Sequence, residues 1–362
     1  MPIIGEEEVK EVSYVLRKGP LTNALGIGPK VTAFESKFAK FVDTKYAVAV
    51  NTGTSALQLA LISSGIKHGD EVILPSFTFV ATAEAVVMTG GKPVFVDIDS
   101  ITFNIDPEKI EEKITDKTKA ILPVDLYGLP ANLKSIQKIA KSRNLSIIED
   151  AAQAHGAKYF GKSVGFLSNV TCWSFYASKN MTTGEGGIVT TNNLETANTI
   201  RMLRSHGEKT KYSSETLGYN YRMSEIQAAI GLVQLKKLPD FVAKRTKNAE
   251  KLTELLSDVS ALDLPHHTED ILSSWNLYTV KLKNSAKIER NQIVEKLRKK
   301  GIGAAVYYDN PIHLMPYYRK NFGLFVLPET EKVAKQVFSL PVHPGLDEIQ
   351  IEYIANTLIS ML

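Results

Sequence analysis

Asp150 and Lys179 are of the types, and at the positions, that could hold a cofactor with a basic ring nitrogen and a reactive aldehyde. Asp150 ends a short apolar run that begins at Leu145. Lys179 follows a second β-like run, 171–176, and enters a loop rich in Gly and Thr. An acid can pair with a protonated ring nitrogen and a lysine can form a Schiff base, and pyridoxal phosphate (PLP) offers both groups. Taken alone, the two residues also fit a helix cap and a solvated loop charge.

A second pattern could bind a phosphate. A short strand, 46–50, is followed by Asn-Thr-Gly-Thr-Ser at 51–55 and then by a helix, 56–62. The first N–H groups of a helix and the positive end of its dipole favour an anion. The hydroxyls of Thr54 and Ser55 could add donors, although simple N-capping explains the same residue types.

The order of the elements indicates which edge these residues share. Strands expected at 71–74, 93–97, 120–124 and 145–150 alternate with helices at 79–88, 107–114 and 131–142. Continuous apolar runs suggest strands that are buried on both faces, and βαβ units imply a largely parallel sheet. Ligands bind beyond the carboxyl ends of such strands, so residues 51–55, the turn 76–79 and Asp150 are expected to converge there.

The remainder divides the chain into two domains. A strand at 188–191 and a helix at 194–204 precede a polar loop, 207–223, and a helix, 224–235. The basic run 236–247 is a helix continuation or a hinge, and we place the boundary near residue 240. The large domain is 1–240 and the smaller α+β domain is 241–362. The elements expected in the latter are a helix from Ala249, strands at 276–282 and 303–307, a helix at 290–299, a loop at 308–318 and a final helix at 348–361.

Composition describes an ordinary globular protein. Of the 362 residues, 44% are hydrophobic and 23% are charged. The net charge of +4 is too mild and too dispersed to indicate nucleic-acid binding. No secretory signal or membrane span is recognisable, and we expect a cytoplasmic protein. The single cysteine, Cys172, excludes an internal disulfide and a cysteine metal cluster, and we expect no metal site.

Six motifs in order resemble the DegT/DnrJ/StrS family of PLP-dependent sugar aminotransferases. They lie at residues 51–57, 75–82, 93–107, 149–156, 174–180 and 218–223, and the tail segment 340–344 is also similar. Together they cover most of the chain. The resemblance implies a type I PLP-transferase fold, like that of aspartate aminotransferase, with a mostly parallel sheet, helices on both faces and a smaller α+β C-terminal domain.

The resemblance also implies a role for each cofactor residue. Lys179 would hold PLP as an internal aldimine and then carry the proton, while Asp150 would pair with the pyridinium nitrogen. Gln153 would bind the phenolic oxygen, and Phe79 would stack on the ring. The phosphate would be held by Thr54, Ser55 and Ser174. Asn220 would reach the phosphate from a neighbouring subunit, which implies a homodimer with shared active sites.

Family members mostly transfer an amino group from glutamate to a keto sugar linked to a nucleotide, often in polysaccharide biosynthesis. Tyr308 and the loop with His313 resemble a family segment near the sugar, and Arg222 could meet a substrate carboxylate or phosphate. A lone His is more often structural, as we expect for His155 and His206. Thr52 and Asp125 differ from commoner family residues, which leaves the substrate preference open but not PLP binding. Lys179 argues against a dehydratase branch that has His at this position.

Two other functions remain open. A PLP enzyme of another reaction type would share the cofactor residues. A non-catalytic regulatory or DNA-binding protein is suggested by some family names, but no helix-turn-helix or basic recognition helix supports it. The sequence does not identify the sugar, the nucleotide or the position of amination.

Overall fold

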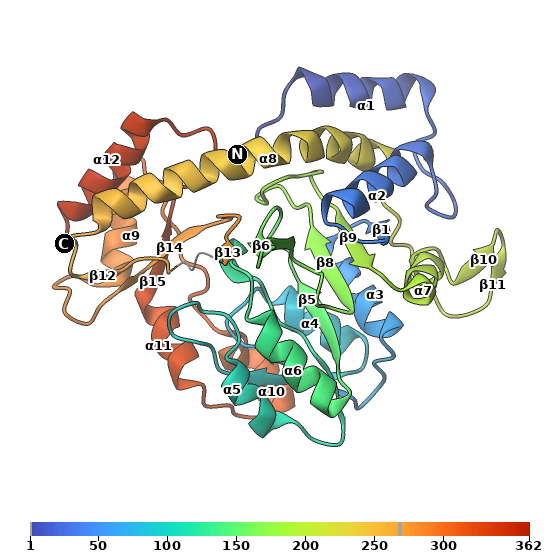
Figure 1. The fold of residues 1–362 in the computed structure, drawn as a ribbon, viewed down its shortest axis with the longest axis horizontal. Helices are drawn as coiled ribbons and strands as arrows, with labels where there is room; N and C mark the ends of the chain where they lie inside the picture. Colours follow the sequence, from blue (N-terminus) through green and yellow to red (C-terminus); the bar gives the residue numbers. More distant parts are fainter. Residues whose placement is uncertain (1, 267–269) are drawn as a thin grey trace.

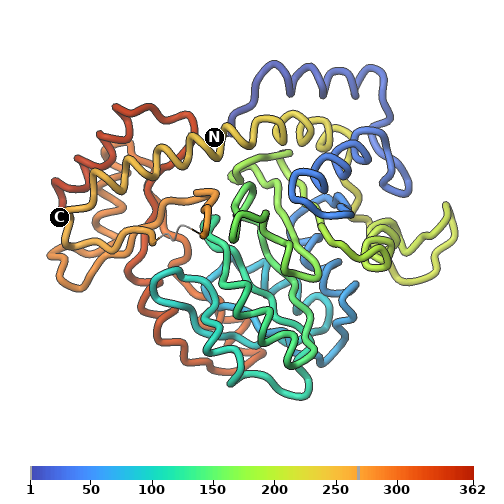
Figure 2. Tube along the Cα trace, viewed as in Figure 1, coloured from blue at the N-terminus to red at the C-terminus, as the bar shows by residue number. Residues whose placement is uncertain are grey.

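The computed structural model describes residues 2–266 and 270–362. Figure 1 shows a large lobe built on a central sheet, a smaller C-terminal lobe beside it, and one long helix that crosses both. Figure 2 follows the same path as a tube. No helix in the described part of the chain is both long enough and apolar enough to cross a membrane.

The central sheet has seven strands in the order β1-β9-β8-β5-β4-β2-β3. Only β9 runs against its neighbours, so six strands point the same way and the expectation of a mostly parallel sheet is confirmed. The strands are β1 (Tyr46–Val50), β2 (Glu71–Pro75), β3 (Lys92–Val96), β4 (Thr118–Ile121), β5 (Ser146–Asp150), β8 (Val170–Ser174) and β9 (Gly187–Thr191).

Both faces of this sheet are buried because alternate side chains of a strand enter different cores. In β5, Ile148 faces one core that extends under most of the sheet, while Ile147 faces another beneath α6. In β8, Cys172 faces the first core and Trp173 packs with α2. The helices of this lobe are α1 (Glu6–Lys18), α2 (Pro29–Phe41), α3 (Gly53–Ser63), α4 (Ala81–Met88), α5 (Pro107–Ile110) with η1 (Glu111–Lys113), η2 (Leu126–Gly128), α6 (Leu133–Arg143) and α7 (Leu194–Arg204).

The long helix α8 (Glu225–Leu256) contains Pro239 in its interior. The sequence-based end at residue 235 is therefore wrong, and the basic run is a continuation of the helix. Proline removes one helical hydrogen bond, which costs about 3 kcal/mol. Burial on both sides of the proline offsets this cost, since Leu238 and Val242 pack in the large lobe and Leu252 packs in the C-terminal lobe. The proposed domain boundary near residue 240 lies inside this helix.

The C-terminal lobe is built on a three-stranded antiparallel sheet in the order β12-β14-β15. Its elements are β12 (Leu262–Asp263), β14 (Tyr278–Leu282), α9 (Arg290–Lys299), η3 (Ile312–Leu314), α10 (Pro316–Phe322), α11 (Pro328–Gln336), β15 (Val337–Leu340) and α12 (Glu348–Ile359). The segment from η3 to α11 packs against the core of the large lobe through Ile312, Tyr318 and Val333. The lobe is thus α+β, as expected, and part of it covers the large lobe.

Three local expectations are wrong. Residues 303–307 form no strand: Ala305 makes a single bridge to Ser339. The expected loop 308–318 includes η3 and the start of α10, and the expected loop 207–223 holds a hairpin, β10 (Glu208–Thr210) and β11 (Ser213–Ser214). A small sheet of β13 (Ile271–Leu272), β6 (Lys158–Tyr159) and β7 (Lys162–Ser163) was not expected.

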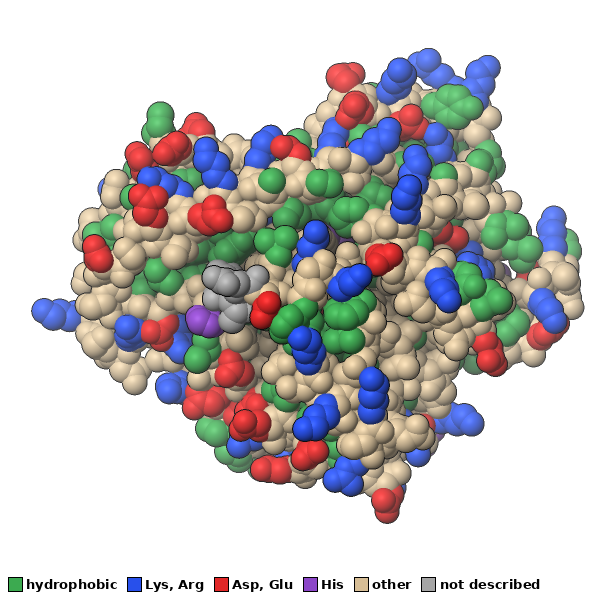
Figure 3. Space-filling view, viewed as in Figure 1, with side chains coloured by type: hydrophobic (Ala, Val, Ile, Leu, Met, Phe, Trp, Pro, Cys, Tyr) green, Lys and Arg blue, Asp and Glu red, His purple; other side chains and the backbone are tan. Residues whose placement is uncertain are grey.

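Charge on the surface is mixed. On the face drawn in Figure 3, basic and acidic side chains lie among one another over both lobes. A nucleic-acid site would instead gather Lys and Arg on one surface.

Candidate functional site

The candidate residues lie at one edge of the central sheet because β1, β2, β5 and β8 end there. Asp150 ends β5 and lies opposite Cys172 of β8 in the parallel register. Ser174 ends β8 and faces the start of α3, since a Cβ on Gly53 would lie 2.6 Å from Cβ of Ser174. Four segments that are distant in the sequence therefore meet at this edge.

The carboxylate of Asp150 is buried and held in place. It accepts hydrogen bonds from Oγ1 of Thr82 at 2.9 Å and from the backbone N–H of Ala152 at 3.1 Å. Burial raises the pKa of Asp150, while the Thr82 and Ala152 hydrogen bonds and the charge of Lys179 act in the opposite direction. A buried acid of this kind gains most from a cationic partner, such as a protonated ring nitrogen.

Lys179 lies in the loop after β8, and its backbone N–H donates to the carbonyl of Tyr176 at 2.9 Å. Burial lowers the pKa of Lys179, and Asp150 partly opposes the shift. A lowered pKa increases the share of neutral amine, which is the nucleophilic form. The next residue fixes the loop, because Nδ2 of Asn180 donates to the carbonyl of Ser274 at 2.7 Å.

The start of α3 forms a cradle for an anion. Oγ1 of Thr52 caps the helix by accepting the N–H of Ser55 at 3.0 Å, and Oγ of Ser55 donates to Asn51 at 2.7 Å. The N–H groups of Gly53 and Thr54 begin the helix and have no acceptor within it. The backbone of β9 packs closely against this turn, since a Cβ on Gly187 would lie 2.3 Å from the carbonyl oxygen of Thr52. This geometry fits a phosphate next to Ser174.

An aromatic and an amide group complete the edge. The ring of Phe79 is 55% exposed, and its centroid lies 6.2 Å from that of Tyr308. Gln153 is bound at both ends: Oε1 accepts the N–H of Tyr127 at 2.7 Å, and Nε2 donates to the Tyr308 hydroxyl at 3.2 Å. Burial raises the pKa of Tyr308, which keeps its hydroxyl protonated. The second Nε2 proton of Gln153 can serve a ring oxygen.

The other expected residues are placed less centrally. His313 is 1% exposed, and its ring bonds to Ser76 just after β2, so its side chain is enclosed by protein at this edge. Arg222 is half-buried and bridges Val50 at the end of β1. Asn220 is exposed, and no hydrogen bond joins it to the other cofactor candidates in the described part of the chain. Of the two histidines expected to be structural, His155 packs between the rings of Trp173 and Phe175, and burial lowers its pKa to about 3, whereas the side chain of His206 is exposed.

The sequence motifs assign no role to Thr82 and Tyr127, although both form hydrogen bonds to residues of the site. Thr82 binds Asp150 from the first turn of α4, and Tyr127 binds Gln153 through its backbone. Thr82 lies in the motif 75–82, but no local pattern marks it as a partner of Asp150, which is 68 residues away. Tyr127 contacts Gln153 through its main-chain N–H, so its residue type does not indicate this contact.

Taken together, these groups fit PLP. A buried acid ends β5, a lysine follows β8, and the start of α3 lies against Ser174 at the same edge of the sheet. An exposed aromatic ring and a hydrogen-bonded amide stand beside them. Each group suits one part of the cofactor: ring nitrogen, aldehyde, phosphate, ring face and ring oxygen.

Known proteins share this chain's organisation. The model of the DegT/DnrJ/EryC1/StrS aminotransferase family matches residues 2–359. The chain is 40% identical to the dTDP-3-amino-3,4,6-trideoxy-alpha-D-glucose transaminase of Streptomyces venezuelae over 90% of this chain and 85% of that protein. It is also 40% identical to the UDP-2-acetamido-2-deoxy-3-oxo-D-glucuronate aminotransferase of Pseudomonas aeruginosa, over 96% and 94% of the two chains.

The solved structures agree with the sequence comparisons. PseC of Helicobacter pylori, an aminotransferase involved in the biosynthesis of pseudoaminic acid, superposes with a TM-score of 0.93. Its sequence is 33% identical, and the alignment covers 99% of this chain and 97% of PseC. Other structural neighbours include a PLP form and a PMP form.

Proposed function

Because the chain belongs to the DegT/DnrJ/EryC1/StrS aminotransferase family, we propose that it uses PLP to transfer an amino group from glutamate to a keto sugar linked to a nucleotide. The family is PLP-dependent, and the resemblance inferred from six motifs is confirmed. The nucleotide and sugar are not fixed by this proposal: the relatives carry names with dTDP, UDP and GDP.

When bound, PLP supplies an aldehyde that takes up an amino group and a ring that takes up electrons. The chain supplies acid–base groups at both reactive positions. We assign Asp150 to the ring nitrogen, where its buried negative charge holds a proton. We assign Lys179 to the aldehyde, where its amine holds the cofactor and, once released, moves a proton between Nζ and the substrate carbon.

The remaining residues bind and orient. The N–H groups at the start of α3, with the hydroxyls of Thr54 and Ser174, would hold the phosphate. The hydroxyl of Ser55, which donates to Asn51 in this structure, would turn to the phosphate when the cofactor is bound. Phe79 would cover the ring face, and Gln153 would bind the ring oxygen while Tyr308 holds its amide in place. Tyr308 thereby acts through Gln153. Direct substrate contacts of His313 and Arg222 remain predictions.

We further propose a homodimer in the cytoplasm, with two domains, 1–240 and 241–362, in each chain. Asn220 is exposed, as a residue that serves a partner's phosphate must be. Large apolar side chains near it are also exposed, among them Leu217 at 81%. Burial against a second copy would remove them from water.

One observation carries the proposal: the buried carboxylate of Asp150 ends β5 at the sheet edge where Lys179 follows β8 and α3 begins next to Ser174. The test is to add PLP to the purified protein, remove the excess, and record the visible absorption. The parent protein should retain a band and Lys179→Ala should not, whereas Lys158→Ala, which alters an exposed lysine on β6, should behave like the parent.

Glutamate should then convert the bound cofactor to its amine form, which restores the aldehyde when a suitable keto nucleotide sugar is added. A panel of such sugars, read by product mass, identifies the substrate. A parent protein that retains no band would overturn PLP dependence. A retained band that glutamate leaves unchanged would overturn the choice of amino donor.

A further inference from the structure

A buried arginine lies beside the Lys179 loop without an acidic partner. Arg245, on the second half of α8, is 6% exposed. Its Nη1 donates to the carbonyls of Trp275 at 2.9 Å and Asn276 at 3.3 Å. Within residues 2–266 and 270–362, Nε has no acceptor and no carboxylate forms an ion pair with the guanidinium. Burial alone lowers the pKa of Arg245 to about 10, so keeping the guanidinium charged at this position costs free energy.

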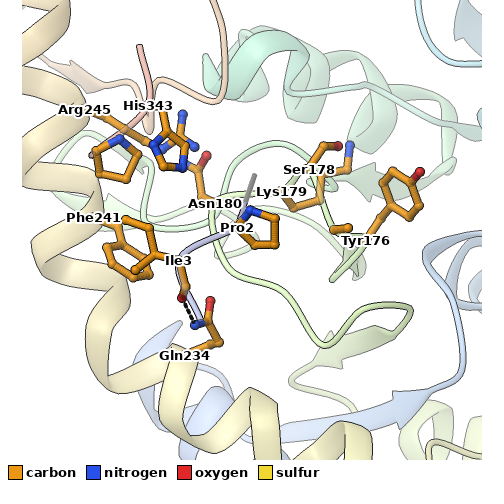
Figure 4. Close-up of a pocket in the computed structure, with 12 residues that line it drawn as sticks. Pro2, Ile3, Tyr176, Ser178, Lys179, Asn180, Gln234, Phe241, Arg245 and His343 are labelled. Atoms are coloured by element: carbon orange, nitrogen blue, oxygen red, sulfur yellow. Dashed lines mark hydrogen bonds between the residues drawn. The ribbon is translucent and has the colours of Figure 1, made fainter. Parts of the chain in front are cut away.

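Arg245 lines a cavity of about 330 Å³. One wall is the segment 176–180, which carries Lys179, and other walls come from Pro2, Ile3 and Phe241. Figure 4 shows Arg245 and Asn180 at one side of this space and Lys179 and Tyr176 at the other. Lys179 and Arg245 therefore both line this cavity.

The charge of this cavity has one sign. None of its lining residues is Asp or Glu, whereas Lys179 and Arg245 are both basic. Two neutral polar groups of the wall are already engaged: Asn180 binds Ser274 and Asn276, and Gln234 binds Ile3 and Glu8. Among the described residues, Nη2 of Arg245 forms no hydrogen bond, and a guanidinium is suited to a carboxylate.

We propose that Arg245 binds the carboxylate of the amino donor, so that the cavity is the donor's docking site. The inference rests on the proposed function and deepens it. An amino acid must bring its amine to the reactive end of the site, and its carboxylate then needs a cation within the same space. Arg245 meets this need, and its Nη1 hydrogen bonds fix the orientation of the guanidinium plane before the donor arrives.

The test measures donor binding and donor use separately. Glutarate, a dicarboxylate without an amine, should bind the PLP-loaded parent in calorimetry and should bind Arg245→Met roughly ten- to a hundredfold more weakly. The glutamate concentration for half-maximal conversion of the cofactor should rise by a similar factor. Arg245→Lys should recover part of the loss. Lys247→Met, which removes an exposed charge two residues further along α8, should match the parent.

A second variant leaves Arg245 in place and guards against misfolding. Ile3→Glu would put a carboxylate into the cavity from a residue that is 36% exposed, and it should weaken glutarate and glutamate binding, while Ile3→Leu should not. Unchanged glutarate binding in both Arg245→Met and Ile3→Glu would overturn the proposal. So would a rise in the half-saturating concentration of the nucleotide sugar alone, because the arginine would then serve the other substrate. If the proposed function is wrong, glutamate will not convert the cofactor in the parent protein, but glutarate binding can still be measured. This outcome differs from a failure of the Arg245 proposal.

Discussion

Ser76 and His313 bind each other through two hydrogen bonds although 237 residues separate them. Oγ of Ser76 lies 2.7 Å from Nδ1 of His313 and accepts the backbone N–H of His313 at 3.0 Å. The carbonyl of Ser76 also accepts the N–H of Ile312 at 3.1 Å. These contacts fasten the loop that carries Tyr308 to the strand end that leads to Phe79, so two groups beside the cofactor position depend on one link.

His313→Ala should therefore destabilise the protein and loosen the site. The variant removes a buried hydrogen bond and leaves a void, so we expect a loss of about 2–4 kcal/mol in unfolding free energy. Urea unfolding measures this loss, and PLP titration should show weaker binding. His313→Asn, which can keep a nitrogen near Ser76, should retain more of both. If PLP affinity is unchanged while the KM for the sugar rises, His313 contacts substrate instead.

Thr82→Val should move the acid limb of the pH profile. Oγ1 of Thr82 donates to the Asp150 carboxylate and thereby lowers its pKa, so removing the hydroxyl raises that pKa further. Ionised Asp150 is then lost at a higher pH, and the acid limb of kcat/KM should shift upward. Thr89→Val, at the other end of α4, is the control because its hydroxyl binds only the carbonyl of Val86. Identical profiles for Thr82→Val and the parent would contradict the assignment.

Gly53→Ala should weaken PLP binding by blocking the phosphate cradle. The new Cβ would lie 2.6 Å from Cβ of Ser174, which forces the helix start away from Ser174. We expect at least a tenfold higher dissociation constant, equivalent to about 1.4 kcal/mol. Spectroscopic titration with PLP gives the constant, and Ser63→Ala at the far end of α3 controls for changes in the helix. Free phosphate should compete with PLP in the parent more strongly than in the variant.

Asp150→Asn should stabilise the cofactor-free protein at neutral pH while it impairs catalysis. Burial raises the pKa of Asp150, so the folded state binds its proton more tightly than the unfolded chain does. The stability from that proton is present below the unfolded pKa of about 3.9 and is lost as pH rises through the folded pKa. The neutral amide escapes this loss. Thermal unfolding of the apo forms should favour Asn near pH 7, and the difference should shrink below about pH 4.

The sequence predicts the residues that carry the chemistry of the site better than it predicts the residues that hold them in place. Asp150 and Lys179 each follow an apolar run, which places both near one sheet edge, but their expected roles depend on the family resemblance. Thr82 binds Asp150 only because the fold brings the first turn of α4 to the end of β5, and no local pattern encodes a contact across 68 residues.

Two errors in the fold have the same origin. Pro239 locally favours a helix end, but burial of Leu238 and Val242 outweighs its cost. Residues 303–307 have a strand-like composition, yet Ala305 alone pairs with Ser339 before the chain turns to bring Tyr308 to Gln153. Tertiary contacts decide both places, and propensity cannot supply them.

Helix α8 also couples the unfolding of the two lobes. Its 32 residues span roughly 48 Å at about 1.5 Å per residue, and its two halves contribute Leu235 to one core and Leu252 to the other. If either core unfolds, the half of α8 that it buries becomes exposed to water. Fraying of that half then weakens the packing of the other half against the second core. The two lobes should therefore melt in one cooperative transition, which scanning calorimetry would record as a single peak with equal calorimetric and van't Hoff enthalpies.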